Sequence, residues 1–339
     1  MRFSPQIHDN RTKHTNFIAT VSLAVAMTAA IVNAQTFQLD SSAPVQHNTW
    51  KLGLAMPTPR MGPFTGVVGG KVYVIGGENN TTVLAVNEVY DPATNTWLKD
   101  RAPLPTPRWV GASAVVDGIL YAIGGFSNTA ALSVVEAYNP KTNKWATDLA
   151  PMPTAEDSIS AVVDEGIIYV IGGDNSARQS VVYAYDPATN AWAQVASLNV
   201  AKSLPAVGLI GTTVIAAGGV ASGNDTVTND NEGYSATTNS WKTLASMPTA
   251  TEGACFEVSN GLLYAAGGFG IGGAGEVLNI LEAYSLKNNL WTTGLSPMPD
   301  AVVNAGSADV AGVLYCFGGS NNGYPFQGTI YNYVQIYQP

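Results

Sequence analysis

Histidine, cysteine and positive charge are scarce in this chain, and each scarcity removes a class of function. Of 339 residues, 3 are histidine, 2 are cysteine, and 15 are lysine or arginine against 24 acidic residues. Histidine-rich metal sites and Ser-His-Asp triads are therefore not expected, and we predict no metal and no cofactor. The formal net charge of −9 argues against nucleic acid and anionic membrane surfaces as partners.

Long apolar runs are also rare, and the one exception lies near the N-terminus. Three basic residues precede an uncharged stretch at 17–32, and Ala34 ends a short sequence typical of signal-peptidase cleavage. This pattern predicts a signal peptide over 1–34 and a mature domain over 35–339. We expect a periplasmic or extracellular protein without a membrane span after cleavage, because sixteen residues are short for a bilayer. An uncleaved anchor is the alternative.

The two cysteines, Cys255 and Cys316, pose a question of pairing. Export favours a disulfide. Alignment of the repeats described below, however, places the two residues on different strands of neighbouring units, and a bridge needs Cα atoms within about 7 Å. We therefore expect two small buried residues rather than a bridge.

Glycine and tryptophan, in contrast, recur with a fixed period. Six glycine pairs end apolar runs at spacings of 48, 48, 46, 49 and 51 residues. They are Gly76-Gly77, Gly124-Gly125, Gly172-Gly173, Gly218-Gly219, Gly267-Gly268 and Gly318-Gly319. Six Asn-x-Trp motifs end at Trp50, Trp97, Trp145, Trp192, Trp241 and Trp291. The first tryptophan precedes every glycine pair, and no tryptophan follows the last pair, which is the phase of a ring cut inside one unit.

Each unit reads as four short antiparallel strands. Runs such as Lys71–Ile75 are rich in β-branched and aromatic residues, and Asp117-Gly118 has the composition of a hairpin turn. A tyrosine follows each glycine pair, and the period and these motifs together resemble the kelch family from about residue 48 to the end. The resemblance implies an all-β, six-bladed kelch β-propeller, with tryptophan rings between blades. We expect the N-terminal segment at Trp50 to close the last blade beside Tyr337.

In kelch propellers, the loops before the first strand and after the second strand of each blade usually form the ligand-binding face. At the corresponding positions this chain is chemically mixed, whereas its scaffold is uniform, which indicates either a shaped binding site or the drift of solvated loop positions. The predicted ligand-binding residues are Arg60, Asn79, Arg108, Trp109, Phe126, Glu156, Asp157, Asn175, Lys202, Glu252, Phe269 and Asn321.

Two functions stay open at this stage. The first is an exported module that binds a carbohydrate or protein ligand on this face. The second follows from a resemblance to the periplasmic sialic-acid mutarotase family (N-acetylneuraminate epimerase), which implies a base carboxylate near a glycine pair and an arginine for the substrate carboxylate. Glu78 and Asp174 are then the catalytic candidates, with Arg60 and Arg108 as clamps. The sequence leaves ligand identity, catalysis and oligomeric state open.

Overall fold

The computed structural model describes residues 47–222, 226–270, 275–322 and 328–339. Within these ranges the chain forms thirty strands and no helix. The predicted signal peptide over 1–34 lies outside the described residues. No helix in the described ranges has the length and apolarity to cross a bilayer.

Six four-stranded antiparallel sheets, here called blades 1 to 6, make up the domain. Blade 1 contains β2 (Phe64–Val68), β3 (Lys71–Ile75), β4 (Asn87–Asp91) and β5 (Thr96–Leu98). Blade 2 contains β6 (Ala112–Val116), β7 (Ile119–Ile123), β8 (Val135–Asn139) and β9 (Lys144–Ala146). Blade 3 contains β10 (Ser160–Asp164), β11 (Ile167–Ile171), β12 (Val182–Asp186) and β13 (Ala191–Val195).

The remaining blades follow the same order along the chain, except for the last strand. Blade 4 contains β15 (Ala206–Ile210), β16 (Thr213–Ala217), β19 (Asn231–Ser235) and β20 (Ser240–Thr243). Blade 5 contains β22 (Cys255–Ser259), β23 (Leu262–Ala266), β26 (Leu281–Ser285) and β27 (Leu290–Thr292). Blade 6 contains β28 (Gly306–Val310), β29 (Val313–Phe317), β30 (Val334–Gln338) and β1 (Thr49–Leu52).

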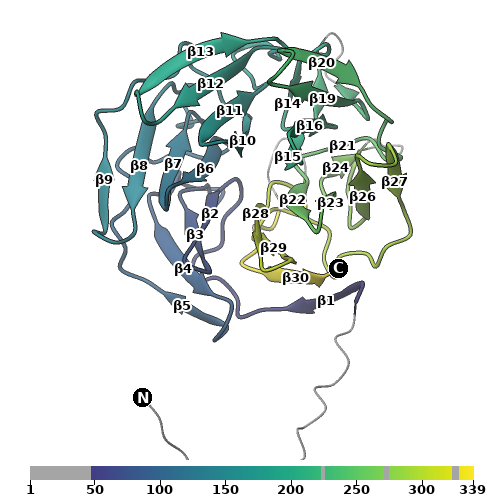
Figure 1. Cartoon of the computed structure of the whole chain (residues 1–339). Coiled ribbons are helices and arrows are strands. Elements are labelled where there is room, and N and C mark those ends of the chain that lie inside the picture. The colour runs from purple at the N-terminus through teal and green to yellow at the C-terminus, as the bar shows by residue number, and fades with distance from the viewer. Residues whose placement is uncertain (1–46, 223–225, 271–274, 323–327) are drawn as a thin grey trace, which may run out of the picture. The chain divides into compact units, whose positions relative to one another are not determined.

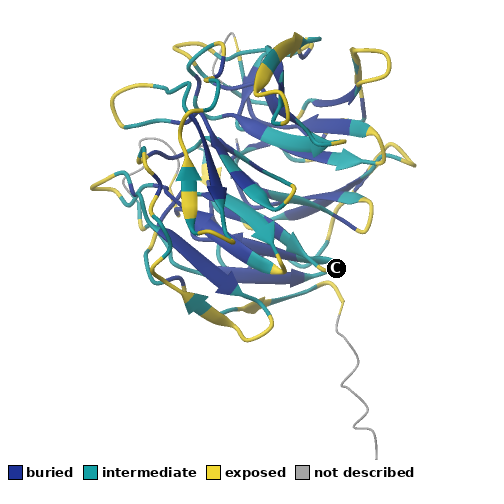
Figure 2. Cartoon of the chain, turned by 60° about the vertical axis from the view of Figure 1, so that its left-hand side comes forward, coloured by how far each residue is buried: buried dark blue, intermediate teal, exposed yellow. Residues whose placement is uncertain are grey.

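The blades are arranged in a ring around a central channel (Figure 1). The innermost strands pack against one another in order, and β28 of the last blade packs against β2 of the first. Apolar clusters form between neighbouring blades; one joins Ala112 and Ile123 of blade 2 to Ile168 and Tyr185 of blade 3. Figure 2 shows the buried residues mainly along the middle strands of the blades, such as β3 and β4, and many of the exposed ones in the loops. The core is thus divided into layers between sheets.

The N-terminal strand closes the ring, as the phase of the repeat predicts. Strand β1 pairs antiparallel with β30, and Trp50 lies opposite Tyr337 (Figure 1). His47 adds a contact from its Nδ1 to the carbonyl oxygen of Pro339 at 2.6 Å. This pairing gives blade 6 its fourth strand and joins the N-terminal and C-terminal ends of the ring.

The Asn-x-Trp motifs form six equivalent clamps at the rim. In blade 2, the Asn143 side-chain oxygen accepts hydrogen bonds from the Tyr138 hydroxyl and from the Ala102 amide, while the Trp145 indole donates to the Ala102 carbonyl. Ala102 belongs to the segment that leaves blade 1, so each clamp holds two blades together. The residues held in this way are Leu54, Ala102, Ala150, Ala196, Ala245 and Ser296.

The same geometry repeats in every clamp. Each motif asparagine adopts a positive φ, between 44° and 57°, a conformation that asparagine tolerates better than most residues. The tyrosine and tryptophan rings pack against each other within the blade in a tilted arrangement, with centroids 4.7–5.2 Å apart. The expected placement of the tryptophans at the contacts between blades is therefore confirmed, and the motif serves architecture.

The glycine pairs lie where neighbouring blades meet most closely. Gly76 and Gly77 have φ values of 65° and 95°, which disfavour any side chain. A Cβ added to Gly76 would also lie 2.7 Å from the carbonyl oxygen of Arg108 in the next blade. The pair therefore permits both the chain conformation and the close approach.

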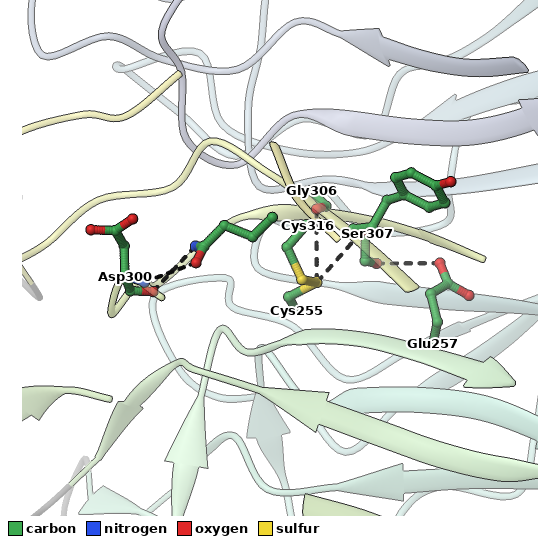
Figure 3. The surroundings of a disulfide bond; sticks show 8 residues. Cys255, Glu257, Asp300, Gly306, Ser307 and Cys316 are labelled. Atoms are coloured by element: carbon green, nitrogen blue, oxygen red, sulfur yellow. Dashed lines mark hydrogen bonds between the residues drawn. A yellow bond between two sulfur atoms is a disulfide. The ribbon is translucent and has the colours of Figure 1, made fainter. Parts of the chain in front are cut away.

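The expectation of two unpaired cysteines is wrong. Cys255 on β22 and Cys316 on β29 form a disulfide with a Cα–Cα distance of 5.9 Å (Figure 3). The separation is short because the inner strand of blade 5 packs against the first two strands of blade 6. The bridge thus links two neighbouring blades near the channel.

Candidate binding face around the channel

A second, smaller set of strand pairings forms one face of the ring. In each blade, the residue after the glycine pair lies opposite a residue of the loop that enters the blade. In blades 4 and 5 these pairings are strands: β14 (Lys202–Ser203) with β17 (Val220–Ala221) and β18 (Thr226–Val227), and β21 (Thr251–Glu252) with β24 (Phe269–Gly270) and β25 (Glu276–Val277). The opposed pairs are Met61 with Glu78, Trp109 with Phe126, Asp157 with Asp174, Ser203 with Val220, Glu252 with Phe269, and Val303 with Ser320.

A closed circle of backbone hydrogen bonds surrounds the channel on this face. Six residues, one from each blade, donate an amide hydrogen to the carbonyl oxygen of the preceding member, at 2.7–3.4 Å. All six have positive φ, from 44° to 58°. The members are Gly62, Val110, Ser158, Leu204, Gly253 and Asn304. Because the circle uses its own amides and carbonyls, recognition at the mouth depends on side chains, above all those of the residues just before it.

Three of the predicted ligand-binding cations lie beneath this face. Arg60 and Arg108 are fully buried and form ion pairs with Glu88 and Glu136, respectively. Burial lowers the pKa of Arg60 to about 10, an effect that its pairing with Glu88 opposes. The Arg108 guanidinium also donates to the carbonyls of Ala122 and Gly124. These side chains join strands within a blade, and they are not presented to a ligand.

Lys202 occupies the same repeat position in blade 4 and has the same arrangement. Its ammonium is fully buried, 3.2 Å from the Glu232 carboxylate. Burial lowers the pKa of Lys202, and the nearby Glu232 opposes that shift. The sequence-based assignment of Arg60, Arg108 and Lys202 to ligand contacts thus meets a physical obstacle, since each would have to leave a buried ion pair.

Glu156 is the counterpart in blade 3, and it has no cation. The position that corresponds to Glu88 and Glu136 is occupied by Tyr183 in this blade. One oxygen of the buried Glu156 carboxyl accepts from the Thr154 hydroxyl at 2.5 Å, and the other has no hydrogen-bond partner. Burial raises the pKa of Glu156 to about 6. Like the three cations, Glu156 lies below the face and is not exposed at its surface.

The side chains that do reach the mouth are mainly acidic. Asp174 lies between Asp157 and Arg178 in the strand pairing of blade 3, and it forms an ion pair with Arg178. Burial raises the pKa of Asp157, and the Arg178 charge counteracts this effect. Burial likewise raises the pKa of Glu252 to about 7, again against the attraction of Arg178. Arg178 is thus ion-paired with Asp174 and acts electrostatically on Asp157 and Glu252, and these four groups together have net negative charge at neutral pH.

Glu78, the other catalytic candidate, lies on blade 1 and belongs to a separate environment. Partial burial raises its pKa, and a hydrogen bond from the Asn80 backbone opposes the shift. The neighbouring Asn79 uses its side-chain oxygen to accept from Thr81 and Thr82, which shapes the loop. Glu78 lies opposite Met61 in blade 1, whereas Asp174 lies opposite Asp157 in blade 3.

Two predicted aromatic residues, Trp109 and Phe126, lie side by side in blade 2. The Trp109 side chain is 9% exposed and donates to the Asn128 side-chain oxygen at 3.2 Å. Its ring covers Gly62 of blade 1, where an added Cβ would lie 3.0 Å away. Phe126 lies opposite Trp109 and lines a hollow with Asp157 and Asp174. An apolar wall and acidic groups thus share one depression.

The remaining predicted residues have different surroundings. Phe269 lies opposite Glu252, and its ring contacts Gly275. Asn175 is exposed at the rim of the hollow. The side-chain oxygen of Asn321 accepts from the Thr329 amide at 2.8 Å and so stabilises its own loop. Of the predicted set, Asp157 and Asp174 lie opposite each other and share a hollow with Phe126, while Glu252 is linked to them only through the electrostatic effect of Arg178.

Sequence analysis missed polar groups on the inner strands. Glu257 on β22 and Ser307 and Asp309 on β28 line the central channel, and the Ser307 hydroxyl donates to Glu257 at 3.3 Å (Figure 3). The available signal was the comparison of strands: at the third position of the inner strands Glu257 stands where other blades have glycine, alanine or valine. Across the described ranges, no group of three or more histidine, cysteine or acidic residues could hold a metal ion.

Comparison with known proteins agrees with this architecture. A family model described as the KLHDC2/KLHL20/DRC7 Kelch-repeats domain matches residues 37–219, more than half of the chain. The chain therefore belongs to the kelch-repeat family. The solved structure of YjhT superposes with a TM-score of 0.72 and 19% sequence identity, covering 83% of this chain and 95% of the other. At that identity the likeness establishes the fold alone.

Matches to curated relatives are short. The F-box/kelch-repeat protein At2g44630 of Arabidopsis thaliana is 42% identical over 59 residues, 17% of this chain and 15% of that protein. The F-box/kelch-repeat protein At5g03020 of the same plant is 45% identical over 51 residues, 14% of this chain and 15% of that protein. The chain thus matches about 15% of the length of these relatives, which corresponds to about one repeat.

Proposed function

We propose that this protein is an exported kelch propeller that binds a basic segment of a partner protein on the acidic mouth of its channel. The acidic mouth is defined by Asp157, Asp174 and Glu252 around Arg178. Loops on a rigid scaffold are a common place for recognition, and here six blades fix the position of each loop. The observation that carries the proposal is that the cations at this face are buried whereas the acids are partly accessible.

That inequality arises from burial. Of the charged residues that the repeat places at this face, the cations Arg60, Arg108 and Lys202 are fully buried in ion pairs. The acids Asp157, Asp174 and Glu252 remain partly accessible; Asp174 is ion-paired with Arg178, and the Arg178 charge acts on the other two. A lysine or arginine of a partner would stabilise the charged forms of Asp157 and Glu252, which burial disfavours, whereas an anionic ligand would destabilise them further.

The hollow beside the acids supports a peptide rather than a lone ion. Phe126 offers an apolar surface next to Asp157 and Asp174. Cations and aromatic rings are frequent partners, and aromatic residues are enriched where proteins bind each other. A basic side chain flanked by an apolar residue therefore fits this depression in both charge and polarity.

Export is supported by two independent features. The composition of residues 1–34 is typical of a secretory signal peptide. The disulfide between Cys255 and Cys316 is of a kind that persists in oxidising compartments and is rare in the cytosol. A fusion of residues 1–60 to a periplasmic reporter tests this part: activity of the reporter is expected, and retention of an unprocessed precursor in the cytosol would contradict it.

Peptide selection tests the binding proposal. A random peptide library presented to the purified protein is expected to yield sequences enriched in lysine and arginine. The double variant Asp157→Asn, Glu252→Gln should bind the selected peptides at least tenfold more weakly, with less dependence on ionic strength. Glu165→Gln is the matched control, because this exposed acid lies on the opposite turn of blade 3.

Results that contradict the proposal are equally defined. Selected peptides without basic residues, or affinity unchanged in the double variant, would exclude the acidic mouth as a cation site. A glycan array serves as the parallel arm. Binding to neutral glycans that is lost in Phe126→Ala but retained in the charge variants would favour the carbohydrate ligand.

A second candidate, sugar mutarotation by carboxylate acid–base chemistry, is favoured by one observation. Glu252 has its pKa raised to about 7, where a carboxyl group exchanges protons readily, and Arg178 is its charged neighbour. In this version the base is Glu252 rather than Glu78 or Asp174, and the clamp is Arg178 rather than Arg60 or Arg108. Exchange spectroscopy of anomers with sialic acid and neutral sugars tests it. Acceleration abolished by Glu252→Gln would support catalysis, and no acceleration by the wild type would end it.

A further inference from the structure

The central channel contains a cavity that is distinct from the acidic mouth. Its volume is about 520 Å³, and its wall is formed by the inner strands of all six blades. Cavities of roughly 300–1,000 Å³ are typical of small-molecule sites. Most of the wall is apolar or small, including Val67, Val115, Val163, Leu209 and Val258. The cavity is therefore large enough for a small organic molecule and is mostly apolar.

The polar side chains of the wall are concentrated on one side. Glu257 of blade 5 and Asp309 of blade 6 supply the two carboxylates, and the Ser307 hydroxyl donates to Glu257 at 3.3 Å (Figure 3). One oxygen of Asp309 accepts from the Gly312 amide at 3.1 Å. The other oxygen, Oδ2, is shielded from solvent and has no hydrogen-bond partner. A buried carboxylate oxygen without a donor is costly unless a ligand or proton supplies one.

The surrounding strands bring no cation to this pair. Glu257 pairs across the sheet with Tyr264 of β23, and Tyr315 of β29 lies near Asp309. Neither β15 nor β2, which pack against these strands, carries a titratable residue. Lys71 of β3 is paired with Asp91. Phe256, next to Glu257 in sequence, adds an aromatic ring to the cavity wall.

We propose that the channel cavity binds a small organic ammonium ion, with Glu257 and Asp309 as the counter-charges. The positive head would lie against the two carboxylates, an N–H or hydroxyl group of the ligand would donate to Asp309 Oδ2, and an apolar body would contact the valine and phenylalanine side of the cavity. Aromatic rings such as Phe256 attract ammonium groups as well. A calcium ion is less suited, because it takes six to eight oxygen ligands and two carboxylates with one hydroxyl supply fewer.

The protonation of the pair supports the same reading. Burial, and then the charge of Asp309, raise the pKa of Glu257 to about 8. The Glu257 carboxyl therefore holds a proton at neutral pH when no cation is bound. A bound ammonium would replace that proton. Affinity is therefore expected to increase with pH up to about 8, by roughly tenfold per unit if one proton is released.

Calorimetric titration with choline tests the proposal, with 3,3-dimethyl-1-butanol as the uncharged analogue of the same shape. Choline is expected to bind at pH 8 with release of about half a proton, and to release about one proton at pH 6.5, while the alcohol binds at least tenfold more weakly. Glu257→Gln and Asp309→Asn should each weaken choline binding at least tenfold. Asp164→Asn is the matched control, because Asp164 ends the inner strand of blade 3 and does not line the cavity.

Three results would contradict the proposal that this cavity binds an ammonium ion. Equal binding of choline and its neutral analogue, unchanged affinity in both carboxylate variants, or displacement of choline by equimolar calcium would each overturn it. Thermal unfolding of each variant shows that the ring is intact, and putrescine serves as a second ammonium probe with a narrower head. Failure here leaves the acidic mouth untouched, since basic peptides are tested there with Asp157 and Glu252 variants.

Discussion

The rim and the centre of this ring are built in opposite ways. At the rim, six clamps repeat the same tyrosine, asparagine and tryptophan with nearly the same distances. Around the channel, the equivalent positions carry cations, acids, aromatics and aliphatic residues. Uniform positions hold blades together, so their variation would cost stability in any blade. Variable positions are free of that demand, which makes them the place to look for a ligand.

Within the centre, burial separates the positions again. Blades 1, 2 and 4 place a cation under the face and a glutamate beside it, whereas in blade 3 these positions carry Glu156 and Tyr183, and the Thr154 hydroxyl contacts both. The same repeat position thus supports the sheet in three blades and leaves a carboxyl without a counter-ion in a fourth. The predictions below sharpen this contrast, from the largest expected effect to the smallest.

Removing one rim clamp is expected to have the largest effect on stability. Trp145→Ala deletes a ring that packs against Tyr138 and donates to Ala102, at a cost of about 3–5 kcal/mol in the free energy of unfolding. Because the clamps are equivalent, Trp192→Ala should lose the same amount to within about 1 kcal/mol. Urea denaturation measures both. A loss below 1 kcal/mol in either variant would refute the role of the ring between blades.

Breaking one buried ion pair is expected to lower the free energy of unfolding by a similar amount. Arg108→Met leaves the Glu136 carboxylate buried without its cation, and we expect a loss of about 3–5 kcal/mol. The double variant Arg108→Met, Glu136→Leu should recover most of it, since no charge then remains buried. Chemical denaturation of the single and double variants gives the comparison. Equal destabilisation by both would show that Arg108 acts through packing alone.

The disulfide contributes less. Replacing both cysteines by serine is expected to lower the free energy of unfolding by about 2–4 kcal/mol, because the bridge closes a segment of 61 residues in the unfolded chain. Differential scanning calorimetry of the variant and of the wild type, with and without reductant, checks this value. Reductant should lower the melting temperature of the wild type alone, and an equal response of both proteins would exclude the bridge as its cause.

Titration of the channel carboxyl gives a smaller, pH-dependent effect. The pKa of Glu257 is raised to about 8 in the folded protein from its ordinary value of 4.5, so the folded state binds this proton more tightly than the unfolded chain. Stability contributed by the protonated carboxyl is therefore present at low pH and declines as pH rises from about 4.5 to 8. Urea midpoints at pH 5 and pH 8 measure the decline.

The matched variants assign that decline to a residue. Glu257→Gln should reduce the difference between the two midpoints, whereas Glu165→Gln, on an exposed turn, should leave it as in the wild type. Glu252 contributes in the same direction up to about pH 7. If Glu257→Gln left the difference between the urea midpoints at pH 5 and pH 8 unchanged, the Glu257 carboxyl would titrate near its ordinary pKa.

The rim could be predicted from the sequence because its motifs are local and repeated. The phase of the glycine and tryptophan series predicted the pairing of Trp50 with Tyr337, which the structure confirms. The centre was less predictable, because burial of Arg60 depends on Glu88, which comes from another strand of the same blade. The equal spacing of Arg60–Glu88 and Arg108–Glu136 was a usable signal. The pairing of Cys255 with Cys316 needed the distance between inner strands of neighbouring blades, which no local pattern contains.

Hydrogen–deuterium exchange with a selected basic peptide tests the central claim, that ligands bind at the variable centre and not at the uniform rim. Protection is predicted for the backbone amides around Ser158, Asp174 and Gly253, which adjoin the acidic mouth. The amides around the rim residues Asn143 and Trp192 should exchange at unchanged rates. Protection confined to the rim, with no change around the mouth, would contradict the account.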